Sequence, residues 1–319
     1  MDPRHLVQLA TILEKGSITQ ASKHLHLTQP TLTHNMKTLE MQAGGQLFVR
    51  SRLGVRSTPL GELLAREGSE IQRRVQDAAA AGARSKLGLQ HQVRIGSGPM
   101  VGAALLPAVA ELLIAQHPGH ALVLHSERPH LLLDQLIDRR HDLVIAPSWR
   151  EHPPEGIVRE LLVDDELGVF CGPGHRFAEA ATLPRGEADD ERWLTLGIAS
   201  PFDKAVFGML REAGVGRTRV EATTLGDAVI LLGLLMKGRH LAVLPRYPVR
   251  LLQTRFPLVE LAIDAPNQPR PIYLMYRESL RDEPAFVGIR QILIDEARRG
   301  AGRSPPADAS AGRAAAAKA

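Results

Sequence analysis

Apolar positions in the first part of the chain recur every three or four residues, which is the spacing of amphipathic helices. A first helix is predicted over residues 4–15, with inward positions at Leu6, Leu9, Ala10 and Leu13. Gly16 is expected to end it, and Ser17 is expected to cap a second helix over residues 18–25. A short turn follows, so the pattern predicts two short helices in close succession.

A third predicted helix carries the first functional hypothesis. Thr28 is expected to cap this helix, which has Pro30 in its first turn and runs to about Met41. Its apolar face consists of Leu32, Met36 and Leu39. The opposite face carries hydrogen-bonding and basic side chains, namely Gln29, Thr31, Thr33, His34, Lys37 and Thr38. In a helix-turn-helix such a face reads base edges and neutralises phosphates, whereas on an ordinary helix it is a solvated surface.

Three arginines cluster around a glycine turn after this helix. Arg50, Arg52 and Arg56 lie on short extended runs around Gly54. A wing along the DNA backbone needs this arrangement, because its guanidinium groups then face phosphates or the minor groove. The first 90 residues hold 12 Lys and Arg but 7 Asp and Glu, while the whole chain has a net charge of +4. The positive excess therefore lies in this segment, which favours a polyanion partner over chance variation in surface charge.

A long helix is predicted from Pro59 to about Lys86, because Thr58 and Pro59 form a capped start. Small and apolar residues recur along it at alternating spacings of four and three, namely Leu64, Gly68, Ile71, Val75, Ala78 and Gly82. So narrow a seam suits pairing with another helix. We expect dimerisation through Leu64, Ile71, Val75 and Ala78. The alternative is a helix packed on its own domain.

The pattern changes after residues 83–92, a polar stretch that is expected to be a hinge. Strands are then predicted at residues 93–96, 121–125, 142–146, 167–171, 220–223, 241–244, 259–263 and 272–276. Helices are predicted at about residues 102–116, 130–140, 203–213, 226–237 and 284–298. This alternation indicates an α/β fold with mixed sheets, in which a ligand binds at strand carboxyl ends and helix N-termini.

The N-terminal residues also carry a family resemblance. The run from Gly16 to Thr33, followed by Leu39-Glu40 and by Leu47-Phe48-Val49-Arg50, is similar to the signature of LysR-type transcriptional regulators. The chain departs from that signature at Ser22, where a second Ala is common, and at His34, where Arg is usual. The departure at His34 leaves the base preference at that position open.

The resemblance continues, less specifically, through the α/β region. It implies a winged helix-turn-helix over residues 1–58, a linker and dimerisation helix over 59–88, and an effector-binding domain over 93–298. That domain would resemble type 2 periplasmic binding proteins, with lobe 1 at about 93–161 and 268–298 and lobe 2 at about 162–267. Residues 300–319 are rich in Ala, Gly and Ser and are expected to form a disordered tail.

The resemblance also assigns site residues by position. DNA would be bound by Thr28, Gln29, Pro30, Thr31, Thr33, His34, Lys37, Arg50, Arg52 and Arg56. An effector would lie between the lobes against Ser97, Gly98, Pro99, Met100, Ser126, Arg128, Pro147, Ser148, Trp149, Ser200, Phe202, Thr223 and Thr224. The open helix start after Ser97 favours an anion, and Trp149 and Phe202 offer an apolar face. For each residue alone, the alternative is an ordinary cap or core role.

The function expected from these features is sequence-specific regulation of transcription, controlled by a small organic or aromatic acid. The expected partners are promoter DNA, further copies of the chain in a dimer or tetramer, the effector and RNA polymerase. No resident cofactor is expected, and the expected location is the bacterial cytoplasm.

The alternatives are a solute-binding protein and an α/β metabolic enzyme with an incidental basic N-terminus. The sequence holds no Gly-x-Ser-x-Gly elbow, no Gly-Lys-Ser/Thr phosphate loop and no His-Glu-x-x-His metal helix. Its single cysteine, Cys171, excludes an internal disulfide and a cysteine-built metal site. No basic and then apolar stretch of a secretory signal opens the chain, and uninterrupted apolar runs fall short of the roughly 20 residues of a membrane span. Both alternatives are therefore disfavoured.

Overall fold

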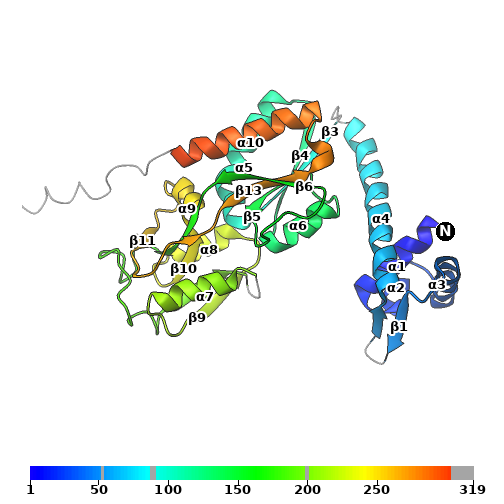
Figure 1. Ribbon diagram of the computed structural model, residues 1–319, viewed down its shortest axis with the longest axis horizontal. Helices are drawn as coiled ribbons and strands as arrows, with labels where there is room; N and C mark the ends of the chain where they lie inside the picture. The colour runs from blue at the N-terminus through cyan, green and yellow to red at the C-terminus, as the bar shows by residue number, and fades with distance from the viewer. Residues whose placement is uncertain (52–53, 87–90, 198–200, 303–319) are drawn as a thin grey trace, which may run out of the picture. The chain divides into compact units, whose positions relative to one another are not determined.

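The computed structural model describes residues 1–51, 54–86, 91–197 and 201–302 (Figure 1). Its contacts divide the chain into two units, residues 1–90 and 91–319. Each unit has apolar clusters of its own, as expected for separately folded domains.

The first unit opens with three helices, α1 (Pro3–Lys15), α2 (Ile18–His24) and α3 (Gln29–Ala43). Their ends follow the predicted signals. Gly16 ends α1 in the left-handed region at φ +62°, which glycine adopts without strain. Ser17 caps α2 through the Gln20 N–H, and Thr28 caps α3 through the Thr31 N–H. The helices enclose one core, made of Leu6, Leu9, Ile12, Ile18, Ala21, Leu32, Met36 and Leu39 together with Leu47 and Phe48.

A two-stranded antiparallel wing, β1 (Phe48–Ser51) and β2 (Gly54–Ser57), leads into the long helix α4 (Pro59–Lys86). Helix α4 packs closely against α1 (Figure 1). A Cβ added at Gly68 would lie 2.0 Å from the Leu6 carbonyl oxygen, and one at Gly61 would lie 1.8 Å from that of Leu47. The backbones therefore touch at these two points, and a larger side chain would force them apart.

The second unit consists of two lobes, each built on one sheet. The sheet of lobe 1 has the order β4-β3-β5-β13-β6. Its strands are β3 (His91–Ser97), β4 (His120–Ser126), β5 (Leu143–Pro147), β6 (Ile157–Val163) and β13 (Ile272–Arg277). Its helices are α5 (Pro99–Gln116), α6 (Pro129–Ile137) and α10 (Pro284–Gly302), with a short 3-10 turn η1 (Glu278–Leu280). Alternate residues of β5 face the α5 and α10 side and the α6 side, so the sheet is covered on both faces.

The sheet of lobe 2 has the order β11-β7-β10-β8-β9, and β12 pairs with β7. Its strands are β7 (Glu166–Cys171), β8 (Arg192–Leu196), β9 (Arg219–Thr224), β10 (Leu241–Pro245), β11 (Val259–Leu261) and β12 (Gln268–Pro269). Its helices are α7 (Asp203–Glu212), α8 (Ala228–Leu235) and α9 (Arg246–Leu252). One core lies between the sheet and α7 and another between the sheet and α8.

The chain crosses between the lobes twice, after β6 and after β12, and the two crossings are tied together. The Arg270 N–H donates to the Asp165 carbonyl oxygen at 2.5 Å. The Asp165 carboxylate accepts a hydrogen bond from the Tyr247 N–H at 2.8 Å. Burial raises the pKa of this carboxyl to about 6. Both crossings therefore meet at one buried polar contact.

The structure departs from the sequence pattern in several places. Strands β6, β8 and β12 and helix α9 are not predicted. Helix α4 reaches Lys86 and β3 begins at His91, so most of the predicted hinge is regular structure, and residues 87–90 lie outside the described part. Helix α10 continues to Gly302, into the predicted tail, whose remaining residues are likewise outside it.

Helix α5 corrects the expectation drawn from apolar runs. Among the described residues it is the one helix long and apolar enough, by length and composition, to span a membrane. The run escapes notice in the sequence because Glu111 interrupts it. Seven of the helix's residues are buried, and most of them pack in the lobe 1 core, as in the central helix of a globular domain.

Candidate functional sites

The polar face of α3 is exposed at the surface of the first unit. Gln29, Pro30, Thr31, His34 and Lys37 are exposed, and Thr33 and Thr38 are half-buried. The Thr28 hydroxyl, besides capping the helix, lies 2.7 Å from the Thr31 hydroxyl. No acidic residue occupies the first turn of α3, so its backbone N–H groups present a positive end to an anion. This face is able to approach a nucleic acid.

The wing is fixed to the turn between α1 and α2. The Val55 N–H donates to the Gly16 carbonyl oxygen at 2.9 Å, and a Cβ at Gly54 would lie 2.6 Å from the same oxygen. Arg56 is exposed on β2. Arg52 and the side chain of Arg50 lie outside the described residues. Wing and helix α3 thus belong to one packed unit.

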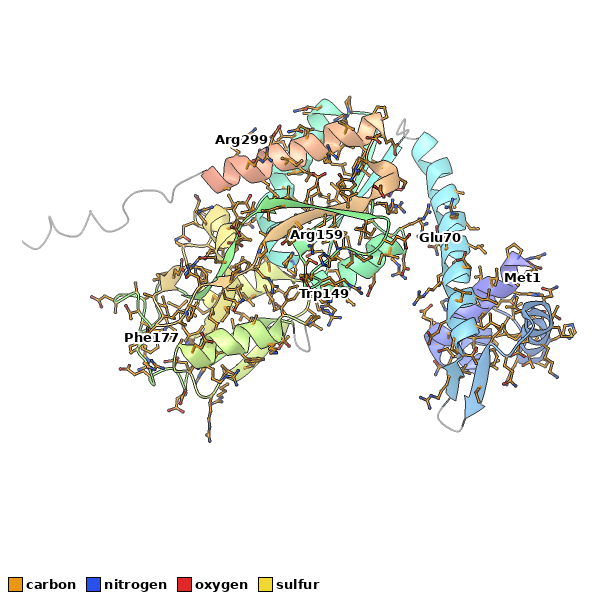
Figure 2. All side chains as sticks on the ribbon, in the orientation of Figure 1. Met1, Glu70, Trp149, Arg159, Phe177 and Arg299 are labelled. Carbon is orange, nitrogen blue, oxygen red and sulfur yellow. The ribbon has the colours of Figure 1, made fainter. Side chains whose placement is uncertain are left out.

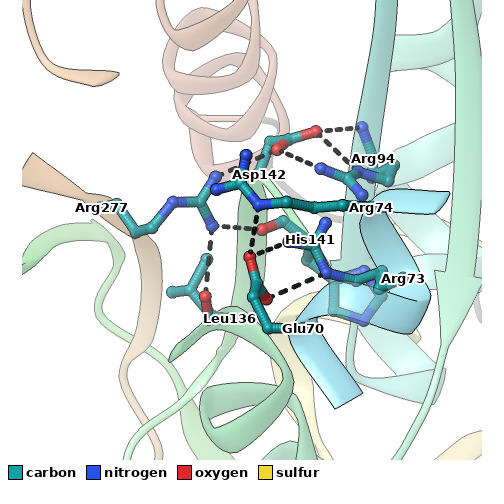
Figure 3. A network of polar contacts seen from close by, with 8 residues as sticks. All are labelled: Glu70, Arg73, Arg74, Arg94, Leu136, His141, Asp142 and Arg277. Carbon is teal, nitrogen blue, oxygen red and sulfur yellow. Dashed lines mark hydrogen bonds and ion pairs between the residues drawn. The ribbon is translucent and has the colours of Figure 1, made fainter. Parts of the chain in front are cut away.

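The seam on α4 divides into two halves. Leu64 and Ile71 are half-buried against the core of the first unit, and Gly68 contacts α1. Val75 is 65% exposed, and Ala78 is exposed as well. The first half of the seam therefore packs within its own unit, while the second half offers an exposed apolar side chain. Glu70, next to Ile71, pairs with Arg73 and Arg74 on the same helix (Figure 3).

The two lobes meet at residues that the resemblance assigns to the effector. The Ser126 hydroxyl donates to the Gly226 carbonyl oxygen at 3.0 Å, from lobe 1 to lobe 2. The Trp149 and Phe202 rings stand edge to face, with centroids 6.2 Å apart. Met100, which is 3% exposed, packs with residues of the α8 side of lobe 2. We call these contacts the interlobe surface.

Ser97 is a buried polar residue at the lobe 1 edge of this surface. It is fully buried at the end of β3, and its hydroxyl has no hydrogen-bond partner among the described residues. Helix α5 starts directly after it, with Gly98 as an N-cap that lends no side-chain hydrogen bond. An unpaired hydroxyl beside an uncapped helix start favours a bound acceptor or anion.

Other predicted effector residues have local roles. Arg128 pairs with Glu127 at 3.5 Å, and a Cβ at Gly197 would lie 3.6 Å from the Arg128 side chain. Pro147 is buried at the end of β5. Thr223 and Thr224 are half-buried on β9, and the Thr224 hydroxyl is buried without a partner among the described residues. Ser200 lies outside the described residues.

Arg159 on β6 positions the loop that carries Trp149, and Figure 2 labels both residues. Its guanidinium donates to the Ser148 hydroxyl at 3.2 Å and to the Arg150 and Glu151 carbonyl oxygens at 2.6 Å and 2.5 Å. The predicted effector residue Ser148 is thus engaged in holding this loop. Arg159 is absent from the predicted set because nothing in the sequence places β6 beside this loop.

Arg270 is a further residue that the sequence analysis misses. Its guanidinium lies 3.6 Å from the centre of the Phe202 ring. Burial lowers its pKa to about 10, although Asp165 and Asp203 act in the opposite direction. An arginine between two prolines next to a strand is the one sequence signal that sets this position apart.

Thiol and metal chemistry have little support in the described residues. Cys171 is fully buried, and burial raises the pKa of its thiol to about 11. Within the described ranges, no three His, Cys, Asp or Glu side chains come together in a way that would hold a metal ion.

Comparison with known families covers almost the whole chain. Residues 3–62 match the bacterial regulatory helix-turn-helix protein of the lysR family, and residues 86–298 match the LysR substrate binding domain. MetR of Haemophilus influenzae, an HTH-type transcriptional regulator, is 31% identical over 76% of this chain and 77% of its own. The DNA-binding transcriptional dual regulator OxyR of Escherichia coli K12 is 27% identical over 87% of this chain and 90% of its own.

Solved structures show the same fold. Full-length CbnR in complex with its target DNA is similar with a TM-score of 0.59 at 18% identity, over 94% of this chain and 100% of that one. A cysteine variant of full-length OxyR from Pseudomonas aeruginosa is similar with a TM-score of 0.55 at 21% identity. The match covers 93% of this chain and 95% of that one. The chain belongs to the LysR family of DNA-binding transcriptional regulators and carries the family's effector-binding domain.

Proposed function

We propose that this regulator reads operator DNA with the exposed face of α3 and lays its wing along the phosphate backbone. The single observation that carries the proposal is the polar face of α3, held outward by a buried apolar face and free of acidic residues in its first turn. Gln29, Thr33 and His34 contact base edges. Thr28, Pro30 and Thr31 lie at the helix start beside the backbone, and Lys37, Arg50, Arg52 and Arg56 contact phosphates.

Replacing Gln29 with Ala tests base reading directly. We expect binding to the cognate operator to weaken by about 1–3 kcal/mol, because a bidentate amide contact to adenine is lost. Affinity for random duplex should stay close to wild type. Competition binding against both duplexes measures the difference, with the exposed Gln20→Ala on α2 as a matched control. Equal losses on the two duplexes would make Gln29 a positioning residue.

Replacing Arg56 with Ala tests the wing. Affinity should fall for all duplexes alike, and the slope of log K against log salt should become shallower by about one unit, since one phosphate contact is removed. Arg50→Ala and Arg52→Ala should act in the same way. Arg185→Ala, an exposed arginine of the second unit, is the control. A wild-type slope in all three wing variants would remove the wing from the interface.

We further propose that the regulator acts in the cytoplasm as a dimer or a dimer of dimers and works with RNA polymerase. The exposed half of the α4 seam at Val75 and Ala78 supports self-association, because an apolar side chain that is 65% exposed on a narrow seam is suited to a partner helix.

The effector we propose is a small organic or aromatic acid bound at the interlobe surface. Its acidic group meets Ser97 and the start of α5, and its apolar part meets Trp149 and Phe202. Supporting this are the unpaired Ser97 hydroxyl and the edge-to-face ring pair from opposite lobes. A ligand that binds one lobe arrangement better shifts the equilibrium towards it and so alters operator geometry.

A peroxide signal, by contrast, gains no support from Cys171. Relatives in Escherichia coli strains are named hydrogen peroxide-inducible genes activators. The reactive form of cysteine is the thiolate, and a fully buried thiol with a pKa raised to about 11 remains protonated at neutral pH.

Thermal-shift screening tests the effector proposal. Organic acids should raise the melting temperature of the full chain more than neutral analogues of the same shape, and Ser97→Ala should reduce that gain. The physical reason is that free helix N–H groups and the hydroxyl favour the anion by about 0.3–1 kcal/mol even at an exposed helix end. Ser279→Ala, at an exposed serine on η1 outside the predicted effector set, is the control. Equal stabilisation by acids and neutral analogues would contradict the anionic effector.

A further inference from the structure

A cavity lies within lobe 2, between α7 and the sheet. Its volume is about 150 Å³, and its apolar walls include Leu167, Val206, Leu210 and Val243. An apolar cavity of about this size is known to hold a single aromatic ring. It shares Phe202 with the predicted effector site, and none of its other walls is among the predicted effector residues.

Trp193, on β8, lines this cavity and carries a buried donor without a partner in the described part of the chain. The residue is 3% exposed and lines the cavity, yet its indole Nε1–H has no acceptor among the described residues. A buried N–H without an acceptor costs about 1–3 kcal/mol, and native proteins pair nearly all such groups with protein, water or ligand. A ligand oxygen that reaches this group would satisfy it.

Arg270 brings a positive charge to the same cavity. Its guanidinium lies 3.6 Å from the centre of the Phe202 ring. The described residues provide no ion pair and no side-chain hydrogen bond for it. Asp203 also lines the cavity, and its charge raises the pKa of Arg270. Burial outweighs this effect and lowers that pKa to about 10, so the guanidinium remains charged at neutral pH.

The mouth of the cavity is apolar. Phe207 of α7 and Val220 of β9 line it and are 49% and 42% exposed. An entering molecule therefore meets exposed apolar side chains, the Arg270 cation, the Asp203 carboxylate and the hydroxyl-bearing Thr195 and Thr218. Sites for small molecules have this composition, with mostly apolar walls and a few polar groups that fix orientation.

We propose that the lobe 2 cavity is a second ligand site, which binds a small organic acid with a compact apolar body. The carboxylate pairs with the Arg270 guanidinium and accepts a hydrogen bond from Trp193 Nε1–H. The apolar body lies among Val206, Leu210 and Val243. The site differs from the interlobe site in its polar groups, because Ser97 is not among its walls, while Phe202 is common to both.

Fluorescence of the full chain provides the test. The chain has two tryptophans, so Trp149→Phe leaves Trp193 as the sole reporter inside the cavity. Phenylacetate is the probe, and 2-phenylethanol is its neutral counterpart. Phenylacetate should change the Trp193 emission saturably and bind at least tenfold more tightly than the alcohol. Arg270→Gln should weaken phenylacetate at least tenfold and leave the alcohol unchanged.

A matched control accompanies the Arg270 variant. Arg185→Gln, an exposed arginine of lobe 2, should leave the phenylacetate-induced change in Trp193 emission unchanged. Trp193→Phe removes the N–H but keeps an aromatic ring, and it should weaken phenylacetate binding severalfold as measured by calorimetry. This variant provides the test if Arg270→Gln fails to fold. Unchanged affinity in both Arg270→Gln and Trp193→Phe overturns the proposal. Equal affinity for acid and alcohol overturns it as well.

Discussion

Replacing Asp142 with Ala should destabilise the second unit by about 3 kcal/mol, because it leaves two largely enclosed arginines without their shared counter-ion. Asp142 directly precedes β5 and accepts hydrogen bonds from the Arg94 backbone N–H and guanidinium at 2.9–3.2 Å, and from Arg277 at 3.1 Å (Figure 3). The side chains of these three residues are 14–20% exposed. One carboxylate therefore joins β3 to β13.

The Arg277 guanidinium also donates to the carbonyl oxygens of Leu136 and His141 at 3.2 Å and 2.6 Å, which ties the end of α6 to the same cluster. Burial lowers the pKa of Arg277, and Asp142 opposes that shift, so removal of the carboxylate leaves the desolvation of this charge uncompensated by Asp142. Asp142→Asn keeps an acceptor oxygen and should lose less stability than Asp142→Ala.

Urea unfolding followed by tryptophan fluorescence measures this effect, since both tryptophans lie in the second unit. Asp264→Ala is the matched control, because Asp264 forms an ion pair with Arg185 in which the side chains are 87% and 65% exposed. Such a surface ion pair contributes little to the free energy of unfolding. If Asp142→Ala and Asp264→Ala unfold at the same urea concentration, the cluster does not stabilise the lobe.

The DNA-binding unit is well predicted from sequence because its signals are local. Gly16, Ser17 and Thr28 act within four residues of themselves, by positive φ or by hydrogen bonds to the next turn, and the helices end where they indicate. The spacing of Leu32, Met36 and Leu39 likewise identifies the buried face of α3. Interactions that act within one turn of a helix can therefore be predicted from the sequence.

The lobes are predicted less completely because their signals are mixed. Strand β6 shows no clean alternation of buried and exposed positions, since Arg159 and Glu160 stand at its centre and are engaged with other strands and loops. Helix α9 has seven residues and contains Pro248, so neither length nor composition suggests a helix. Tertiary contacts override local preference in both elements.

The ligand-facing residues are the hardest to predict, because sequence distance hides their neighbours. Ser126 bonds to Gly226, and Arg270 stacks on Phe202, across separations that no local pattern records. The family resemblance brings Trp149 and Phe202 into one predicted site, and the structure does place their rings in contact. The contact of Arg270 with Phe202 is recognised only in the folded chain.

Replacing Gly68 with Ala should unfold or loosen the DNA-binding unit and abolish operator binding, while the second unit keeps its stability. A Cβ at this position would lie 2.0 Å from the Leu6 carbonyl oxygen and 2.4 Å from its carbon, and both belong to the α1 backbone. Backbone atoms cannot turn aside as the end of a side chain can, so α1 and α4 must separate. Overpacking a tight core costs about 1–3 kcal/mol, and a backbone clash lies at the upper end.

Helix propensity acts in the opposite direction, which makes the outcome decisive. Ala is favoured over Gly inside a helix by about 1 kcal/mol, so an unopposed substitution should stabilise α4. Gly82→Ala on the same helix is the matched control, because a Cβ there meets nothing within 4 Å. Thermal unfolding by circular dichroism, with operator affinity measured in parallel, should show Gly82→Ala at or above wild-type stability and Gly68→Ala well below it. Equal stabilisation by both substitutions would mean that α1 and α4 do not touch at Gly68, and that the first half of the seam is open for a partner helix.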